Sequence, residues 1–137
     1  MTTQVAAQTP PRIDEVIWPW IDSYCTFMKA DHTFVFDDLR SWRFVFFTAF
    51  PEKGNDIMKR GFMRIDGQLR ELALESVSKV NGSERRRYHS HDDPPYLIEV
   101  ASEAGKPGYE AVGYLGRITV SREDATSSVM FKGDCGV

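Results

Sequence analysis

The segment His89-Ser90-His91-Asp92 holds the residues best suited to chemistry. Side chains two positions apart in a strand point to the same side, so His89 and His91 can reach one metal ion, with Asp92 as a third ligand. A metal site also needs a defined geometry, which this pattern does not supply. A solvated strand end that leads into a proline pair is the simpler interpretation, and no cofactor is expected.

The same strand carries a run of arginines. Arg85 and Arg87 alternate onto the side of the two histidines, whereas Arg86 and Tyr88 face the other way. Such a strand can hold a carboxylate-rich partner, a phosphate or an RNA backbone. A charged edge strand that prevents edge-to-edge pairing gives the same pattern. Arg85, Arg87 and Tyr88 are the partner-binding residues predicted here.

Two tryptophans flank a proline in Trp18-Pro19-Trp20. Exposed tryptophans anchor many protein interfaces, so Trp18 and Trp20 join the predicted partner-binding residues. The alternative use of these rings is the packing of a helix against a sheet.

No residue is predicted to be catalytic. The pairs Asp37-Asp38, Asp92-Asp93 and Glu123-Asp124 are typical of turns, whereas a carboxylate dyad needs groups that converge from different segments. The chain has no G-x-S-x-G, no Walker A motif and no G-x-G-x-x-G after a strand. An enzymatic function is therefore open but disfavoured.

The arginine strand is one arm of a hairpin predicted to turn at Asn81-Gly82, because this dipeptide suits the positive φ angles of a type I′ turn. The preceding arm is expected to run as one strand from residue 62 to residue 80, with a bulge near Gly67 or Arg70. The returning arm covers residues 84–90. Other strands are expected at residues 42–50, 96–101, 109–121 and 127–131.

Residues 19–29 show a different periodicity. Ile21, Tyr24, Cys25 and Met28 recur at three- and four-residue steps, and Pro19 suits the first turn of a helix. The sequence therefore predicts a helix here that covers one face of the strand at residues 42–50.

These elements predict a mainly β fold at the border of the α+β class. About six strands form an antiparallel meander, which curls into a sandwich or a partly open barrel with the N-terminal helix packed across it. The length of 137 residues suits one core. Residues 1–12 are predicted to be a flexible segment and residues 13–137 a single β-rich domain.

Cys25 and Cys135 match no zinc spacing and no C-x-x-C pattern. They can form a disulfide in an oxidising compartment, or stay buried thiols in the cytosol. The N-terminus shows no intact signal peptide, which favours the cytoplasm. A removed leader together with an oxidised pair would instead indicate the periplasm or secretion. No apolar run approaches the roughly 20 residues of a membrane span.

The net charge of −3 disfavours nucleic acid as a partner, because affinity for phosphates comes largely from a basic surface. The preferred function is a non-enzymatic β-domain that binds a protein partner, as an inhibitor, immunity or accessory protein. One alternative is a carrier that holds a small apolar ligand in the curled sheet. A second is a metal-binding or hydrolytic protein that uses His89 and His91.

Overall fold

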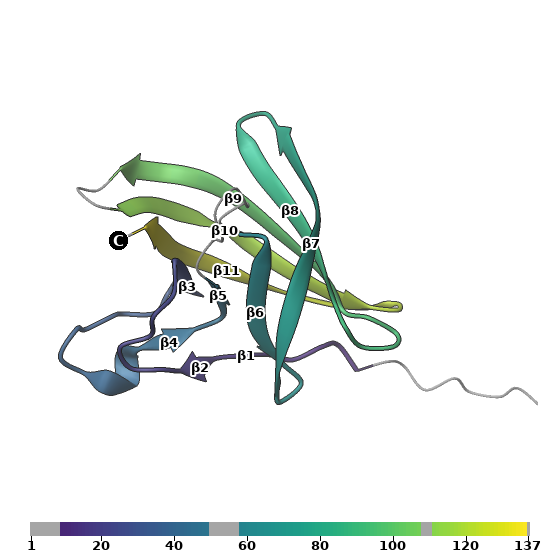
Figure 1. Cartoon of the computed structure of the whole chain (residues 1–137), viewed down its shortest axis with the longest axis horizontal. Coiled ribbons are helices and arrows are strands. Elements are labelled where there is room, and N and C mark those ends of the chain that lie inside the picture. The colour runs from purple at the N-terminus through teal and green to yellow at the C-terminus, as the bar shows by residue number, and fades with distance from the viewer. Residues whose placement is uncertain (1–8, 50–57, 108–110, 137) are drawn as a thin grey trace, which may run out of the picture.

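The computed structural model describes residues 9–49, 58–107 and 111–136. Its centre is a closed antiparallel barrel in which eight strands pair in the order β6-β5-β3-β11-β10-β9-β8-β7, and β7 returns to β6 (Figure 1). The mainly β class and the antiparallel meander are therefore confirmed. The barrel has eight strands rather than about six, and it is closed rather than partly open.

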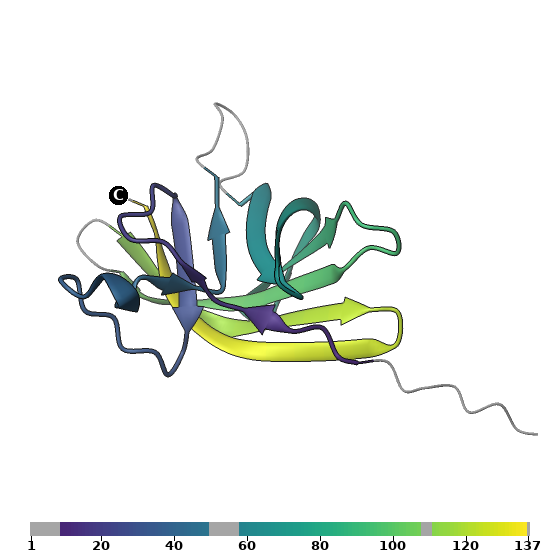
Figure 2. The ribbon, with the colours of Figure 1, turned by 90° about the horizontal axis from the view of Figure 1, so that it is seen from below.

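The barrel strands follow one another around the ring. They are β3 (Cys25–Lys29), β5 (Phe46–Thr48), β6 (Arg60–Ile65), β7 (Gln68–Val80), β8 (Ser83–Ser90), β9 (Leu97–Pro107), β10 (Ala111–Arg122) and β11 (Ala125–Gly136). Outside the ring, β1 (Ile13–Asp14) pairs with β6, and β2 (Val16–Ile17) pairs with β4 (Arg43–Phe44). Figure 2 shows this N-terminal segment, in purple, crossing one side of the barrel.

The helix predicted over residues 19–29 is wrong. The described residues contain no α-helix, and the second half of the segment is β3. Cys25 and Phe27 are fully buried, and the residues that alternate with them are partly exposed, which is the period of a strand. Pairing with β11 on one side and β5 on the other outweighs the local helical spacing, because only the sheet buries Phe27 in the core.

Two tight turns set the register of β6, β7 and β8. The predicted hairpin at Asn81-Gly82 is confirmed, with φ angles of +51° and +82°. The single strand predicted from residue 62 to residue 80 is wrong, because Asp66-Gly67 forms a second turn of the same kind, with φ angles of +52° and +82°. The bulge predicted near this position lies further on, between Leu74 and Ser76.

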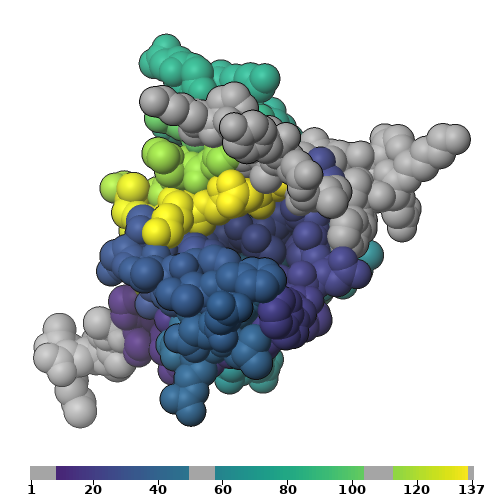
Figure 3. Space-filling view, turned by 90° about the vertical axis from the view of Figure 1, so that its left-hand side faces the viewer, coloured from purple at the N-terminus to yellow at the C-terminus, as the bar shows by residue number. Residues whose placement is uncertain are grey.

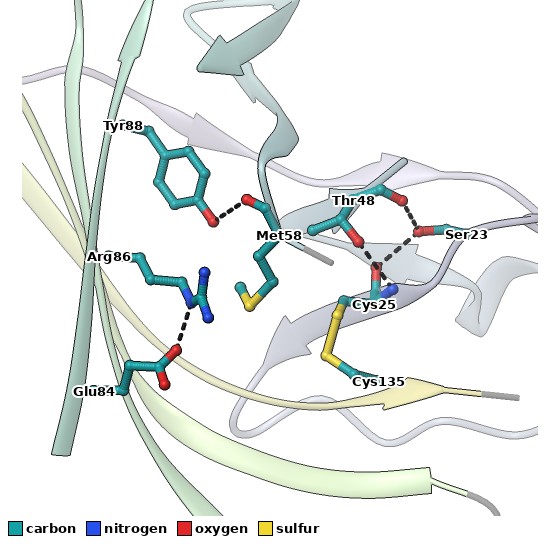
Figure 4. Close-up of a disulfide and its surroundings, with 8 residues drawn as sticks. All are labelled: Ser23, Cys25, Thr48, Met58, Glu84, Arg86, Tyr88 and Cys135. Carbon is teal, nitrogen blue, oxygen red and sulfur yellow. Dashed lines mark hydrogen bonds and ion pairs between the residues drawn. A yellow bond between two sulfur atoms is a disulfide. The ribbon is translucent and has the colours of Figure 1, made fainter. Parts of the chain in front are cut away.

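The ring closes between the first and last barrel strands, β3 and β11. A disulfide joins Cys25 to Cys135 across this seam, as the sequence allowed (Figure 4). Gly133 lies opposite Phe27, and a Cβ atom there would lie 2.2 Å from the carbonyl oxygen of Thr26. Close approach of the two strands therefore requires glycine at this position.

The barrel interior holds a continuous apolar core rich in aromatic rings. Its largest members are Phe27, Phe46, Tyr88, Tyr96 and Phe131. Residues 1–8 of the segment predicted to be flexible lie outside the described residues. The described part contains no helix long and apolar enough to cross a bilayer.

Candidate functional site

Several charged side chains surround Tyr96 where the turns at one end of the barrel meet. The tyrosine ring is 1% exposed and lies between Arg70 and Arg122, whose Cζ atoms are 4.5 and 4.7 Å from its centroid. Tyr96 Oη donates a hydrogen bond to Asp66 and accepts one from Arg122 Nη1 at 3.3 Å. Arg70 also donates to Asp92. We call these five residues the tyrosine network.

The carboxylates of the tyrosine network are held in their charged form. Burial by itself would raise the pKa of Asp66, but hydrogen bonds from Tyr96 and the Arg12 amide, with the charges of Arg12 and Arg70, lower it. The pKa of Asp92 is lowered although burial opposes this, because Ser90 and Arg70 stabilise the anion. Burial, followed by Asp66, raises the pKa of Tyr96. The network is thus a set of matched donors and acceptors that stabilises the barrel end.

Two of the three residues predicted to bind a metal, His89 and Asp92, lie against other charged side chains. His89 Nδ1 lies 2.8 Å from a carboxylate oxygen of Glu75, and Asp92 accepts a hydrogen bond from Arg70. The ring centroids of His89 and His91 are 6.0 Å apart. No group of three histidine, cysteine, aspartate or glutamate side chains within the described ranges is placed to hold a metal ion.

The two predicted arginines point outward and share one carboxylate. Arg85 Nη1 lies 3.9 Å from one Glu99 oxygen, and Arg87 Nε lies 3.4 Å from the other. The assignment of Tyr88 to a partner surface is wrong, because this residue is 1% exposed and its hydroxyl donates to the Met58 carbonyl at 2.7 Å (Figure 4). The alternation of β8 places Tyr88 inside the barrel and its neighbour Arg87 outside.

The largest concentration of exposed apolar side chains lies beside β2 and β4. Within the described residues, seven of the thirteen exposed large apolar side chains fall between residues 17 and 39, so they form a local surface rather than a scatter. In Figure 3 this part of the chain, in purple and blue, forms a continuous surface next to β11, in yellow. The rings at its centre are Trp18, Trp20, Phe34, Phe36 and Trp42, which we call the aromatic face.

Four rings of the aromatic face, those of Trp20, Phe34, Phe36 and Trp42, contact one another, and the backbone of Trp18 bonds to that of Trp42. The centroid of Trp20 lies 4.9 Å from those of Phe36 and Trp42, and Phe34 lies 5.0 Å from Trp42. The Trp18 amide donates to the Trp42 carbonyl at 2.9 Å. Two predicted partner-binding residues, Trp18 and Trp20, thus come together here, whereas Arg85 and Arg87 lie elsewhere on β8.

Hydrogen bonds inside the loop between β3 and β4, residues 30–42, hold the rings of Phe34, Phe36 and Trp42 in position. Ser41 is buried, and its hydroxyl accepts from the Val35 amide at 2.9 Å and donates to backbone carbonyls of the same loop. Trp42 Nε1 donates to the Phe36 carbonyl at 3.1 Å. The 3₁₀ turn η1 (Leu39–Ser41) follows Asp38, whose side chain accepts from the Arg40 amide. The loop is therefore ordered although the rings of Phe34 and Phe36 are exposed.

Trp20 is held in a conformation that bulky residues rarely adopt. Its φ angle is +58°, and such backbone costs roughly 1–3 kcal/mol. Its side chain is 57% exposed, so burial in the core does not offset that cost. Strain of this kind is common at binding sites, where a side chain must be presented in one orientation.

An apolar groove of about 300 Å³ extends from Trp18 along β5 and β6. The ring of Phe47 lies 5.5 Å from that of Trp18 and stacks on that of Phe62 at 5.3 Å. Leu69, which is 54% exposed, lines the groove on β7, and Asp22 is the charged residue among its described lining. As far as its described lining goes, the groove therefore has an apolar floor and the carboxylate of Asp22. We call it the Trp18 groove.

Comparison of the chain with protein-family models, with curated proteins and with solved structures gave no match. The function must therefore be argued from the surface itself. Sequence reasoning did not assign Phe34, Phe36 or Trp42 to a surface. The signal that could have indicated one is the Phe34-Val35-Phe36 run directly before the turn formers Asp37-Asp38.

Proposed function

We propose that the chain is a non-enzymatic binding protein that recognises a protein partner through the aromatic face. The observation that carries this proposal is the cluster of contacting rings in which the exposed Trp20 and Phe36 pack on the partly exposed Trp42. Clustered exposed apolar surface marks interaction sites, and tryptophan is among the residues that contribute most to binding energy. Order before binding lowers the entropy cost of association.

The disulfide indicates where this partner is to be sought. Disulfides persist in oxidising compartments and are rare in the cytosol. Cys25 and Cys135 are joined in the structure, so we expect the partner in the periplasm or outside the cell.

Position-specific photo-crosslinking tests the proposal. A photoreactive amino acid at Phe36 is expected to give one discrete adduct with a partner protein in the source cells. The matched position is Leu97, which is 49% exposed on β9 and reports on the surface of Arg85 and Arg87. An adduct from Leu97 together with none from Phe36 would contradict the proposal, and so would adducts of the same proteins from both positions.

A second candidate function is the carrying of a small apolar ligand inside the barrel. One observation favours it: Arg86 is 8% exposed on the inner side of β8, where its Nε donates to Glu84 (Figure 4). Burial of the Arg86 guanidinium is costly, although Glu84, whose side chain is 28% exposed, offsets part of the cost, and a buried cation can hold the polar end of an otherwise apolar ligand. Native mass spectrometry of the purified chain tests this candidate, since a carrier is expected to show a bound small molecule that an Arg86→Leu variant lacks.

A further inference from the structure

We infer that the Trp18 groove receives an apolar side chain of the partner and that Asp22 pairs with an arginine or lysine beside it. This inference rests on the proposed function, because the groove begins at Trp18 of the aromatic face. It adds the chemistry of the partner, which is a basic segment with an apolar residue next to its cation.

The size and lining of the groove support the proposed apolar side chain of the partner. Its volume of about 300 Å³ matches one or two large side chains rather than a folded element. Its floor is the stack of Phe47 on Phe62, and its two sides are Trp18 and Leu69, which are 45% and 54% exposed. An apolar side chain placed between them would remove the exposed surface of Trp18 and Leu69 and the partly exposed ring of Phe62 from water at once.

The charge of the surrounding surface supports the proposed arginine or lysine of the partner. Asp22, Asp31 and Asp37 are exposed, and none of their carboxylates forms an ion pair within the described residues. The nearby cations Lys29 and Arg43 are already engaged, because both lie within 4 Å of one Glu15 oxygen.

Within the described residues 20–42, Arg40 is the cation that remains to balance these three aspartates and the exposed Asp38. The surface around the rings therefore has an excess of negative charge. A basic partner complements this charge, and complementary charge favours association and selects against acidic partners.

The position of Asp22 selects arginine or lysine in particular. It is the charged lining residue of the groove that also contains Trp18. A guanidinium or ammonium group there can form an ion pair with the Asp22 carboxylate and contact the Trp18 ring at the same time. Both interactions favour a cation over a neutral group at this position. An anionic membrane surface would instead be repelled by the same three carboxylates.

Selection from a random-peptide display library tests the inference. The full-length chain is immobilised, and peptides that also bind a Trp18→Ser variant are discarded. The expected result is enrichment of peptides in which arginine or lysine adjoins leucine, phenylalanine or tryptophan. Enriched peptides that lack a basic residue would overturn the inference.

Affinities of an enriched peptide then separate the two halves of the site. We expect Leu69→Ser to weaken binding about tenfold and Asp22→Asn about fivefold, and the Asp22 variant should also depend less on salt. The matched controls are Leu97→Ser and Asp93→Asn, which change exposed residues elsewhere and should leave binding within about twofold.

Failure of the inference and failure of the proposed function are distinguishable. If a crosslink forms at Phe36 but Asp22→Asn binds that partner as the unchanged chain does, the partner uses the aromatic face and the inference is wrong. If no crosslink forms at Phe36 and the chain binds vesicles of phosphatidylglycerol in a Trp18-dependent manner, the face is a membrane surface and both are wrong.

Discussion

Tyr96 and Trp20 are both large aromatic residues near the surface of the barrel, yet their surroundings differ. Tyr96 is 1% exposed between two guanidinium groups, and its hydroxyl is hydrogen-bonded. Trp20 is 57% exposed, contacts other exposed rings and has a positive φ angle. The surroundings of Tyr96 are explained by folding alone, whereas those of Trp20 are not. The difference separates a structural network from a binding surface.

Removal of the disulfide should have the largest effect, because both regions depend on a closed ring. Cys25 and Cys135 are 110 residues apart, and a bridge over about 100 residues contributes about 4–5 kcal/mol in the chain-entropy model. We expect a Cys25→Ser/Cys135→Ser variant to lose stability of this order in guanidinium unfolding. A loss below about 1 kcal/mol would show that strand pairing alone holds the seam between β3 and β11.

Truncation of Tyr96 should come next. Tyr96→Ala removes a buried ring together with its hydrogen bonds to Asp66 and Arg122, so we expect a loss of about 3–5 kcal/mol. Tyr96→Phe keeps the ring between the arginines and should lose only about 1–2 kcal/mol. The two losses are measured by denaturant unfolding, and equal losses would mean that the hydroxyl, not the ring, organises the network.

Acid should weaken the tyrosine network selectively. The folded-state pKa values of Asp66 and Asp92 are lowered, so their contribution to stability is complete above the unfolded value near 4. It is lost as the pH falls from about 4 through the lower folded pKa. We expect an Asp66→Asn variant to show a flatter dependence of melting temperature on pH in this window. A variant curve parallel to that of the unchanged chain would contradict this assignment.

Truncation of Trp20 should have the smallest effect on stability. Trp20→Gly removes ring contacts that are largely exposed, but glycine adopts a positive φ angle without strain. The two effects oppose each other, so we expect a change within about 1 kcal/mol by denaturant unfolding. A loss of stability comparable to that of Tyr96→Ala would show that Trp20 is needed for folding, as Tyr96 is, and would contradict the difference between the two residues.

The sequence predicted those parts of the fold that local chemistry determines. The turn at Asn81-Gly82 and the alternation of Arg85, Arg87 and Tyr88 on β8 required no knowledge of distant residues. The helix prediction was wrong because β3 is specified by its pairing with β11, which follows more than 100 residues later. Asp66-Gly67 is a turn signal of the same kind as Asn81-Gly82, but the period-two alternation of Met63, Ile65 and Leu69 continues across it and favours a single strand.

The candidate site was less predictable than the fold. Trp18 and Trp20 could be chosen by residue type, but the rings of Phe34, Phe36 and Trp42 reach them only through the loop that Ser41 orders. Exposure also depends on the closed barrel, since a helix over residues 19–29 would have buried the tryptophans. Local pattern therefore indicated the residue type, and the long-range pairing decided which residues are exposed.

The affinity of the crosslinked partner for Trp20→Gly, compared with Tyr96→Phe, tests the central claim most directly. Both variants are first confirmed to be folded at the temperature of the titration. A partner that binds the aromatic face should bind Trp20→Gly at least about thirtyfold more weakly, which corresponds to about 2 kcal/mol, and should bind Tyr96→Phe as it binds the unchanged chain. Unchanged affinity for Trp20→Gly would contradict the claim that the aromatic face is the binding surface.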